Sequence, residues 1–183
     1  MIAAESERLT RLVENLLDLS RIQSGEVEPR AELCTAEELI GAALDSLDAP
    51  PSALELALDP GLPQIRADGV QVERALANVI DNSLRYGGDA PVTIRGQTVG
   101  KQLVIEVADR GPGIAASEQG RNFEPFYRGG KNRTGGSGLG LAIARGFAEA
   151  NGGELRLRPA PDHGTIFAFH FPAVREPMVT PSG

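Results

Sequence analysis

The chain reads Asn78-Val-Ile-Asp-Asn82-Ser-Leu-Arg85-Tyr86 at the end of a helix that the apolar spacing predicts from about Gly69. One side of this helix is apolar and carries Val72, Leu76, Val79 and Ile80. At about 100° per residue, Asn78, Asn82 and Arg85 lie on roughly the opposite side. Amide oxygens suit Mg²⁺ and a guanidinium suits phosphate. The stretch alone leaves open a metal and phosphate site or a solvated polar face.

A second stretch, Asp109-Arg-Gly111-Pro-Gly113, follows a predicted strand. Apolar residues alternate onto one face of that strand, namely Leu103, Ile105 and Val107. Asp109 continues the same parity, so its carboxylate points toward the apolar layer and needs a partner. The exocyclic amine of adenine is a suitable donor, and the two glycines let the backbone approach a base. The alternative interpretation is an aspartate that forms a turn.

A glycine cluster precedes a predicted apolar helix at 139–151, with glycine at positions 135, 136, 138 and 140. Such a turn offers free amides and the positive end of a helix to anions. It is not a Walker A loop, because no Gly-Lys-Ser/Thr follows. A flexible linker is the alternative interpretation.

A fourth stretch, Phe123-Glu-Pro-Phe126-Tyr-Arg128, precedes the glycine cluster, and Lys131 and Arg133 lie between the two. Aromatic anchors at one end and glycines at the other describe a mobile flap at about 123–137 that carries basic residues. An ordinary surface loop with aromatics packed in the core is the alternative. The order of the four stretches is what makes them informative together.

Strand and helix signals elsewhere alternate in a way that predicts a mixed sheet with helices on one face, an α/β two-layer sandwich. Strands are expected at 27–33, 53–58, 64–66, 91–99, 101–109, 154–158 and 165–171. Thr35-Ala-Glu-Glu38 fits a capping box, which opens a helix through about Leu47. The strands are mostly hairpin-linked, with few parallel crossover units.

The first segment, 3–24, reads as one long helix that ends at Ser24-Gly25. Its apolar stripe is broad and contains Leu9, Leu12, Val13, Leu16, Leu17, Leu19 and Ile22. That width suits a helical bundle better than a lone surface helix. We expect the missing helices to come from a second copy, from sequence outside this chain, or from both.

Bulk properties narrow the class of protein. The net charge of −7 argues against a nucleic-acid partner. The single cysteine, Cys34, excludes an intrachain disulfide and favours a small buried side chain. No apolar run approaches about 18 residues, and the start lacks the pattern of a signal peptide, so we expect a cytoplasmic domain.

The four stretches together resemble the N, G1, F and G2 boxes of sensor histidine kinases of two-component systems. These kinases share a superfamily with the gyrase, Hsp90 and MutL ATPases. The resemblance covers about residues 5–172, and the stretch Arg11–Gly25 is most similar to potassium-responsive, Kdp-type kinases. It implies a Bergerat-type ATP-binding fold, with ATP and Mg²⁺ as the bound groups.

The resemblance also implies roles for individual residues of the helix and of the strand end. Asn82 is the expected Mg²⁺ ligand, and Asn78 is its polar support. Arg85 is expected at the phosphates, Tyr86 at the base, and Asp109 on the adenine amine.

The glycine stretch and the flap receive roles in the same way. Arg128, at the base of the lid, is expected to help phosphoryl transfer, so Asn78, Arg85 and Arg128 form the expected catalytic set. Thr165, after Gly164, is expected to close the adenine pocket. The remaining nucleotide contacts implied are Gly111, Gly113, Ile114, Phe126, Gly136, Gly138, Leu139 and Gly140.

The resemblance divides the chain into the second helix of a dimerisation and phosphoacceptor hairpin (1–25), a catalytic domain (26–172) and a loose tail (173–183). The only histidines, His163 and His170, lack the sequence context of a phosphoacceptor. The accepting histidine is therefore expected on a helix absent from this chain. The expected partners are that domain, a cognate response regulator and, as one option, a second copy bound through residues 3–24. The full-length parent can be anchored in the inner membrane.

Two other functions stay open at this point. Gyrase- and Hsp90-like switches activate water with a glutamate one turn before the metal asparagine, and here that position is Asn78, which cannot act as a general base. A module that binds ATP for sensing or scaffolding, without catalysis, is the other alternative.

Overall fold

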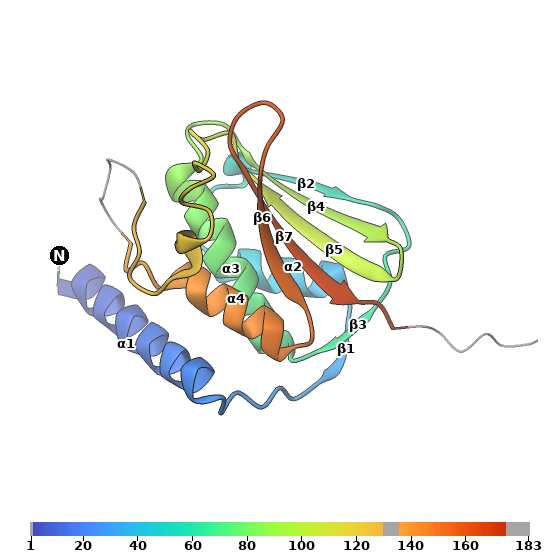
Figure 1. The fold of residues 1–183 in the computed structure, drawn as a ribbon, viewed down its shortest axis with the longest axis horizontal. Helices are drawn as coiled ribbons and strands as arrows, with labels where there is room; N and C mark the ends of the chain where they lie inside the picture. Colours follow the sequence, from blue (N-terminus) through green and yellow to red (C-terminus); the bar gives the residue numbers. More distant parts are fainter. Residues whose placement is uncertain (1, 130–135, 175–183) are drawn as a thin grey trace, which may run out of the picture.

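The computed structural model describes residues 2–129 and 136–174 (Figure 1). The helices are α1 (Ile2–Ser24), α2 (Ala36–Asp45), α3 (Gly69–Tyr86), α4 (Gly140–Ala150) and the short 3₁₀ turns η1 (Pro51–Ala53) and η2 (Arg121–Phe123). The strands are β1 (Glu32–Cys34), β2 (Leu54–Leu58), β3 (Ile65–Ala67), β4 (Val92–Val99), β5 (Gln102–Ala108), β6 (Glu154–Pro159) and β7 (Thr165–Pro172). Within the described ranges, no helix combines the length and apolarity needed to cross a membrane.

The main sheet has five strands in the order β2-β4-β5-β7-β6. β2 runs parallel to β4, and the other neighbours are antiparallel. This arrangement confirms the predicted mixed sheet with hairpin connections. β1 and β3 pair separately as a small antiparallel sheet.

The helices α2, α3 and α4 form a second layer on one face of the five-stranded sheet (Figure 1). The sheet residues that point into this layer alternate along β5 and β7 and are fully buried: Leu103, Ile105, Val107, Phe167, Phe169 and Phe171. The predicted two-layer sandwich is therefore confirmed, and its core lies between α3, α4 and these two strands.

Local capping fixes where two of the helices begin. Asp68 caps α3 by accepting a hydrogen bond from the Gln71 amide at 3.2 Å. Thr35 and Glu38 make the predicted capping box at the start of α2, with bonds of 3.2 and 3.0 Å. These signals need no distant partner, which is why the predicted helix starts agree with the structure.

The strand predicted at 27–33 is wrong in both position and length, because β1 covers only Glu32–Cys34. Its partner β3 has three residues, so only three residues of β1 find a ladder. The residues just before β1 make other contacts than a strand ladder. Pro29 has no amide hydrogen to donate, and the Arg30 amide donates to Asp68 Oδ2 at 2.9 Å.

The first two residues of the predicted loose tail at 173–183 make backbone hydrogen bonds. The Ala173 amide donates to the Lys101 carbonyl at 2.9 Å, and the Val174 amide donates to the Gln64 carbonyl at 2.8 Å. Residues 175–183 lie outside the described residues, as do Lys131, Arg133 and Gly135 of the predicted flap.

The helix α1 has one face buried against the rest of the chain and one exposed apolar face. Asp18 and Leu19 are buried against the rest of the chain, and Ile22 packs so close to α4 that a Cβ added at Gly146 would lie 2.5 Å from its Cγ2. The second face is exposed and carries Leu9, Leu12, Val13, Leu16 and Leu17. The single broad stripe expected from the sequence is thus divided, because Leu19 and Ile22 dock α1 onto the α/β domain.

A charged contact accompanies this docking. Asp18 Oδ2 lies 2.6 Å from Arg74 Nη2 of α3, an ion pair by distance, although the guanidinium does not align on it as a hydrogen bond. The Asp18 side chain is only 7% exposed. Burial raises the pKa of Asp18, and the opposing attraction of Arg74 and Arg21 is smaller.

The raised pKa of Asp18 predicts how stability depends on pH. Because the folded chain binds this proton more tightly than the unfolded chain, the contribution of Asp18 is fully present below its ordinary pKa of about 4 and is lost as pH rises through the folded value. We expect the difference in free energy of unfolding between Asp18→Asn and the unchanged chain to shift in favour of the variant as pH rises from about 4. Urea unfolding at a series of pH values measures this difference, and parallel curves for the two proteins would contradict it.

Candidate functional site

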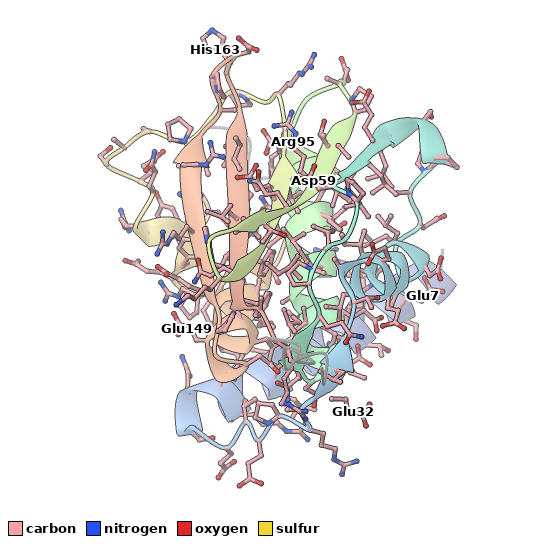
Figure 2. All side chains as sticks on the ribbon, turned by 90° about the vertical axis from the view of Figure 1, so that its right-hand side faces the viewer. Glu7, Glu32, Asp59, Arg95, Glu149 and His163 are labelled. Atoms are coloured by element: carbon pink, nitrogen blue, oxygen red, sulfur yellow. The ribbon has the colours of Figure 1, made fainter. Side chains whose placement is uncertain are left out.

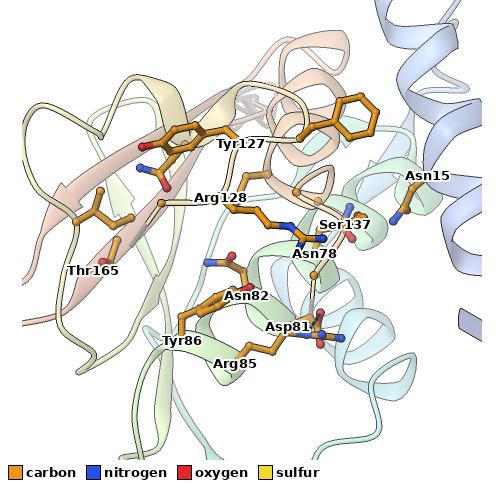
Figure 3. A pocket seen from close by; sticks show the side chains of 18 of the residues that line it. Asn15, Asn78, Asp81, Asn82, Arg85, Tyr86, Tyr127, Arg128, Ser137 and Thr165 are labelled. Carbon is orange, nitrogen blue, oxygen red and sulfur yellow. Dashed lines mark hydrogen bonds and ion pairs between the residues drawn. The ribbon is translucent and has the colours of Figure 1, made fainter. Parts of the chain in front are cut away.

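One large cavity, of about 1400 Å³, lies between α1, α3, the loop after β5 and the segment before α4 (Figure 3). Most of the residues singled out in the sequence line it: Asn78, Asn82, Arg85, Tyr86, Asp109, Gly113, Ile114, Phe126, Arg128, Gly136, Gly138, Gly140 and Thr165. Four stretches that are far apart in the sequence are therefore brought together on one hollow surface.

Asp109 marks one end of the cavity. The residue directly follows β5 and is buried, 6% exposed, on the helix side of the sheet as its parity predicts. Its Oδ1 accepts hydrogen bonds from the amides of Gly111 and Thr165 at 3.0 and 3.1 Å. Among the described residues Oδ2 has no hydrogen-bond partner, so one carboxylate oxygen is fixed and the other is available to a donor in the cavity.

Two glycines allow the backbone to come close around Asp109. A side chain at Gly164 would overlap the Asp109 carbonyl, and its φ of +103° is itself unfavourable for other residues. A side chain at Gly111 would overlap the Tyr86 carbonyl. The Asp109 carboxylate is therefore held by its backbone surroundings and lines the cavity.

The polar face of α3 forms the floor of the cavity, as the helical spacing predicts. Asn78 and Asn82 are half-buried there, and Tyr86 lies against Gly136 from the opposite segment. Arg85 donates from Nε to Asp81 Oδ2 at 2.8 Å. Figure 3 shows Asn78 and Asn82 pointing into the cavity, with Asp81 and Arg85 beside each other at its edge.

The amide side chains on this face of α3 suit a hard cation whose other ligands come from a bound molecule and water. No cluster of His, Cys, Asp and Glu able to hold a metal occurs in residues 2–129 and 136–174. Asn82 offers an amide oxygen, which Mg²⁺ accepts together with phosphate oxygens and water. The residues therefore fit a Mg²⁺ ion that binds with a nucleotide rather than alone.

A backbone hydrogen bond joins the two sides of the flap near its base. The Phe126 amide donates to the Gly138 carbonyl at 2.8 Å, and Gly138, with φ of +74°, leaves no room for a side chain next to Phe126. Phe126 is 63% exposed and lines the cavity, a position open to a bound nucleotide, so the alternative of an aromatic packed in the core does not apply to it.

Phe123 and Tyr127 anchor the first end of the flap. Phe123 is buried, with the Arg145 guanidinium 5.1 Å from its ring centre. The Tyr127 hydroxyl bonds to Glu118 at 3.2 Å, and burial together with this carboxylate raises the pKa of Tyr127. These contacts fix the segment before Arg128, which lines the cavity.

Two predicted nucleotide contacts do not line the cavity. Leu139 is fully buried in the core, where it precedes α4, and Gly111 reaches the site only through its amide bond to Asp109. Both residues therefore shape the backbone next to the cavity and do not present a side chain to it.

Several lining residues were not found from the sequence. Asp81 and Ser137 lie inside the motifs, and their positions between the predicted residues could have indicated that they line the cavity. The α1 residues had no local signal, because only the docking of α1 brings them there: Glu5, Arg8, Leu9, Arg11, Leu12 and Asn15.

Neither histidine lies in the cavity. His163, with φ of 67°, is at the exposed tip of the β6–β7 hairpin, far from α1 (Figure 2). His170 is half-buried on β7, 3.3 Å from Gln102 Oε1, and burial lowers its pKa. Their positions agree with the prediction that both are structural or surface histidines.

Comparisons with known proteins agree with this geometry. Residues 67–175 match the family described as Histidine kinase-, DNA gyrase B-, and HSP90-like ATPase. The chain is 37% identical over 171 residues to the sensor protein KdpD of Escherichia coli, which covers 92% of this chain and 19% of that protein. It is 32% identical over 173 residues to the alginate biosynthesis sensor protein KinB of Pseudomonas aeruginosa, which covers 92% of this chain and 29% of KinB. The chain thus spans less than a third of the length of these relatives.

Solved structures give the same result for the fold. Full-length ShkA in complex with AMPPNP aligns with a TM-score of 0.77 and 28% identity, over 96% of this chain and 38% of that one. The histidine kinase AdeS of Acinetobacter baumannii aligns with a TM-score of 0.74 and 25% identity, over 94% of this chain and 82% of that one. The chain belongs to the family of histidine kinase-, DNA gyrase B- and HSP90-like ATPases and contains the ATPase domain of a sensor histidine kinase.

Proposed function

We propose that this chain binds Mg-ATP in the cavity between α3 and the flap and transfers the γ-phosphoryl group to a histidine on a separate helix. The observation that carries the proposal is the Asp109 carboxylate, which is buried, held at Oδ1 by two amides and presented to the cavity. A fixed acceptor of this kind recognises an exocyclic amine and rejects a carbonyl in the same place. The relative ShkA, solved with AMPPNP, supports a nucleotide as the ligand.

The other polar residues around the cavity are proposed to bind Mg²⁺, the base and the phosphates. Asn82 is proposed as the Mg²⁺ ligand, with Asn78 beside it, and the bound ion would neutralise phosphate charge. Tyr86 would cover the base, and Thr165 would close that end. Arg85 and Arg128 line the cavity and would stabilise the charge of the transferred group.

Asn78 supports transfer to a histidine over a water-activating switch. It lines the cavity one helical turn before Asn82, at the position from which a carboxylate would deprotonate water. An amide cannot take that proton. An imidazole acceptor needs no such base, because its free nitrogen lone pair is already nucleophilic, so positioning and charge neutralisation are enough.

The partners of the reaction follow from this assignment. We propose that residues 1–25 belong to a dimerisation and phosphoacceptor unit and that 26–172 form the catalytic domain. The exposed face of α1, defined above by Leu9 to Leu17, supports pairing with further helices, from a second copy or from the acceptor unit. A response regulator is the proposed final acceptor of the phosphoryl group.

Mixing the chain with labelled ATP and a separately produced histidine-bearing hairpin of a Kdp-type kinase tests the proposed transfer. We expect label on the hairpin and none on the chain alone, because His163 and His170 lie outside the cavity. The label should be acid-labile, as expected for phosphohistidine. Label on the chain alone would contradict the assignment, and a hairpin without label despite ATP binding would favour a sensing module.

A further inference from the structure

The cavity is longer than the motifs that define it. Figure 3 shows Thr165 at one side, then Asn82 and Asn78 with Ser137, and finally Asn15 of α1 at the opposite side. The Thr165 amide donates to Asp109, which places Asp109 at the first of these sides. If Asp109 binds the base, as proposed above, a nucleotide laid along the motifs would extend its phosphates toward Asn78 and Ser137. Its last phosphate would then face the α1 wall.

Asn15 differs from the other α1 residues on that wall. The others, Glu5, Arg8, Leu9, Arg11 and Leu12, are exposed side chains along the outer turns of the helix. Asn15 is half-buried, and its amide points from α1 into the cavity (Figure 3). An amide that is already partly desolvated loses little freedom when it binds a ligand.

The position of Asn15 is fixed by the contacts that follow it on the same helix face. Asp18, one turn later, lies 2.6 Å from Arg74 of α3, the helix that also carries Asn78 and Asn82. Ile22, one turn further, rests on Gly146 of α4. Asn15 is therefore held relative to the polar face of α3 by two contacts on a rigid element.

We propose that Asn15 is a positioning residue for the terminal phosphate, donating a hydrogen bond from its amide to a γ-phosphate oxygen. The inference rests on the proposed function. It assigns to α1 a part in distinguishing a nucleoside triphosphate from a diphosphate, because only the triphosphate reaches that wall. It also makes triphosphate binding and the docking of α1 mutually reinforcing, since each favours the other.

Calorimetry on the whole chain with AMPPNP and with ADP tests the proposal. We expect Asn15→Ala to weaken AMPPNP binding about tenfold, the effect of losing one charge-assisted hydrogen bond, and to leave ADP binding unchanged. Gln23→Ala removes an exposed amide from the same helix, outside the cavity, and should change neither affinity.

A second pair of variants separates the position of α1 from the chemistry of Asn15. In Gly146→Ala the new methyl group collides with the Ile22 side chain, so this contact between α1 and α4 must shift, while α4 gains helix propensity. Like Asn15→Ala, this variant should lose affinity for AMPPNP and keep its affinity for ADP. The double variant Gly146→Ala with Ile22→Ala should regain the affinity for AMPPNP. Adding Asn15→Ala to Gly146→Ala should cause no further loss.

The outcomes distinguish this inference from the proposed function. If the unchanged chain binds neither AMPPNP nor ADP, the proposed function fails and the inference fails with it. If both bind and Asn15→Ala keeps the ratio of the two affinities, the role of Asn15 is refuted while the nucleotide site stands. A loss of affinity for both nucleotides to the same degree would also refute it, because the effect would not be specific to the last phosphate.

Discussion

Asp109→Asn should weaken the binding of an ATP analogue about 100-fold, because a charge-assisted hydrogen bond is replaced by two opposed donors. With the amides of Gly111 and Thr165 on one side, the new side chain must turn its oxygen toward them and its NH₂ toward the adenine amine. The opposite orientation is equally unfavourable, since it sets the NH₂ against two backbone N–H groups. Calorimetric titration with AMPPNP measures the change.

The base itself supplies the most specific control for Asp109. The unchanged chain should prefer ATP to inosine triphosphate, which carries a carbonyl where adenine has its amine, and Asp109→Asn should lose that preference. Asp81→Asn makes the same chemical change at the edge of the cavity, beside Arg85, and should leave the preference intact. If the two variants weaken binding equally, the base does not lie against Asp109.

Asn82→Ala should lower the rate of phosphoryl transfer to a histidine-bearing hairpin by about 100-fold or more, the usual effect of losing one preorganised group that stabilises transferred charge. The substitution lies inside α3 on its polar face, and alanine favours a helix, so the fold should be kept. The more direct measurement is AMPPNP affinity with and without Mg²⁺. Mg²⁺ should tighten binding to the unchanged chain and have little effect on the variant.

Glu73→Ala provides the matched control for Asn82, because it shortens another side chain of α3 that does not line the cavity. It should keep both the transfer rate and the response to Mg²⁺. Should Asn82→Ala respond to Mg²⁺ as strongly as the unchanged chain, another group must bind the ion.

Most of the fold could be predicted because its signals are local. The α3 helix was predicted with its observed bounds, since the Asp68 cap and the apolar spacing both lie within the segment. The parity of β5 placed Asp109 on the buried side of the sheet for the same reason. Such features depend on neighbours two to four residues away, which a single sequence displays.

The errors share a dependence on distant contacts. The extent of β1 is set by a three-residue partner more than 30 positions away, and the division of the α1 stripe is set by Gly146 and Arg74. Which aromatics of the flap are buried also depends on the tertiary structure, since Phe123 is buried whereas Phe126, with a φ of 65°, is exposed. Asn15 could not be singled out, because it lies outside the four stretches that predict the nucleotide site and reaches the cavity only through the docking of α1.

The hydrogen bond between the Phe126 amide and the Gly138 carbonyl has a consequence for how this protein tolerates change. A loop whose two ends are already joined can be lengthened, shortened or exchanged without pulling on the sheet or on α4. Each doubling of its length costs only about 0.6 kcal/mol of closure entropy. Insertions between Gly129 and Gly136 should therefore be tolerated, while Arg128 and the remainder of the domain keep their places.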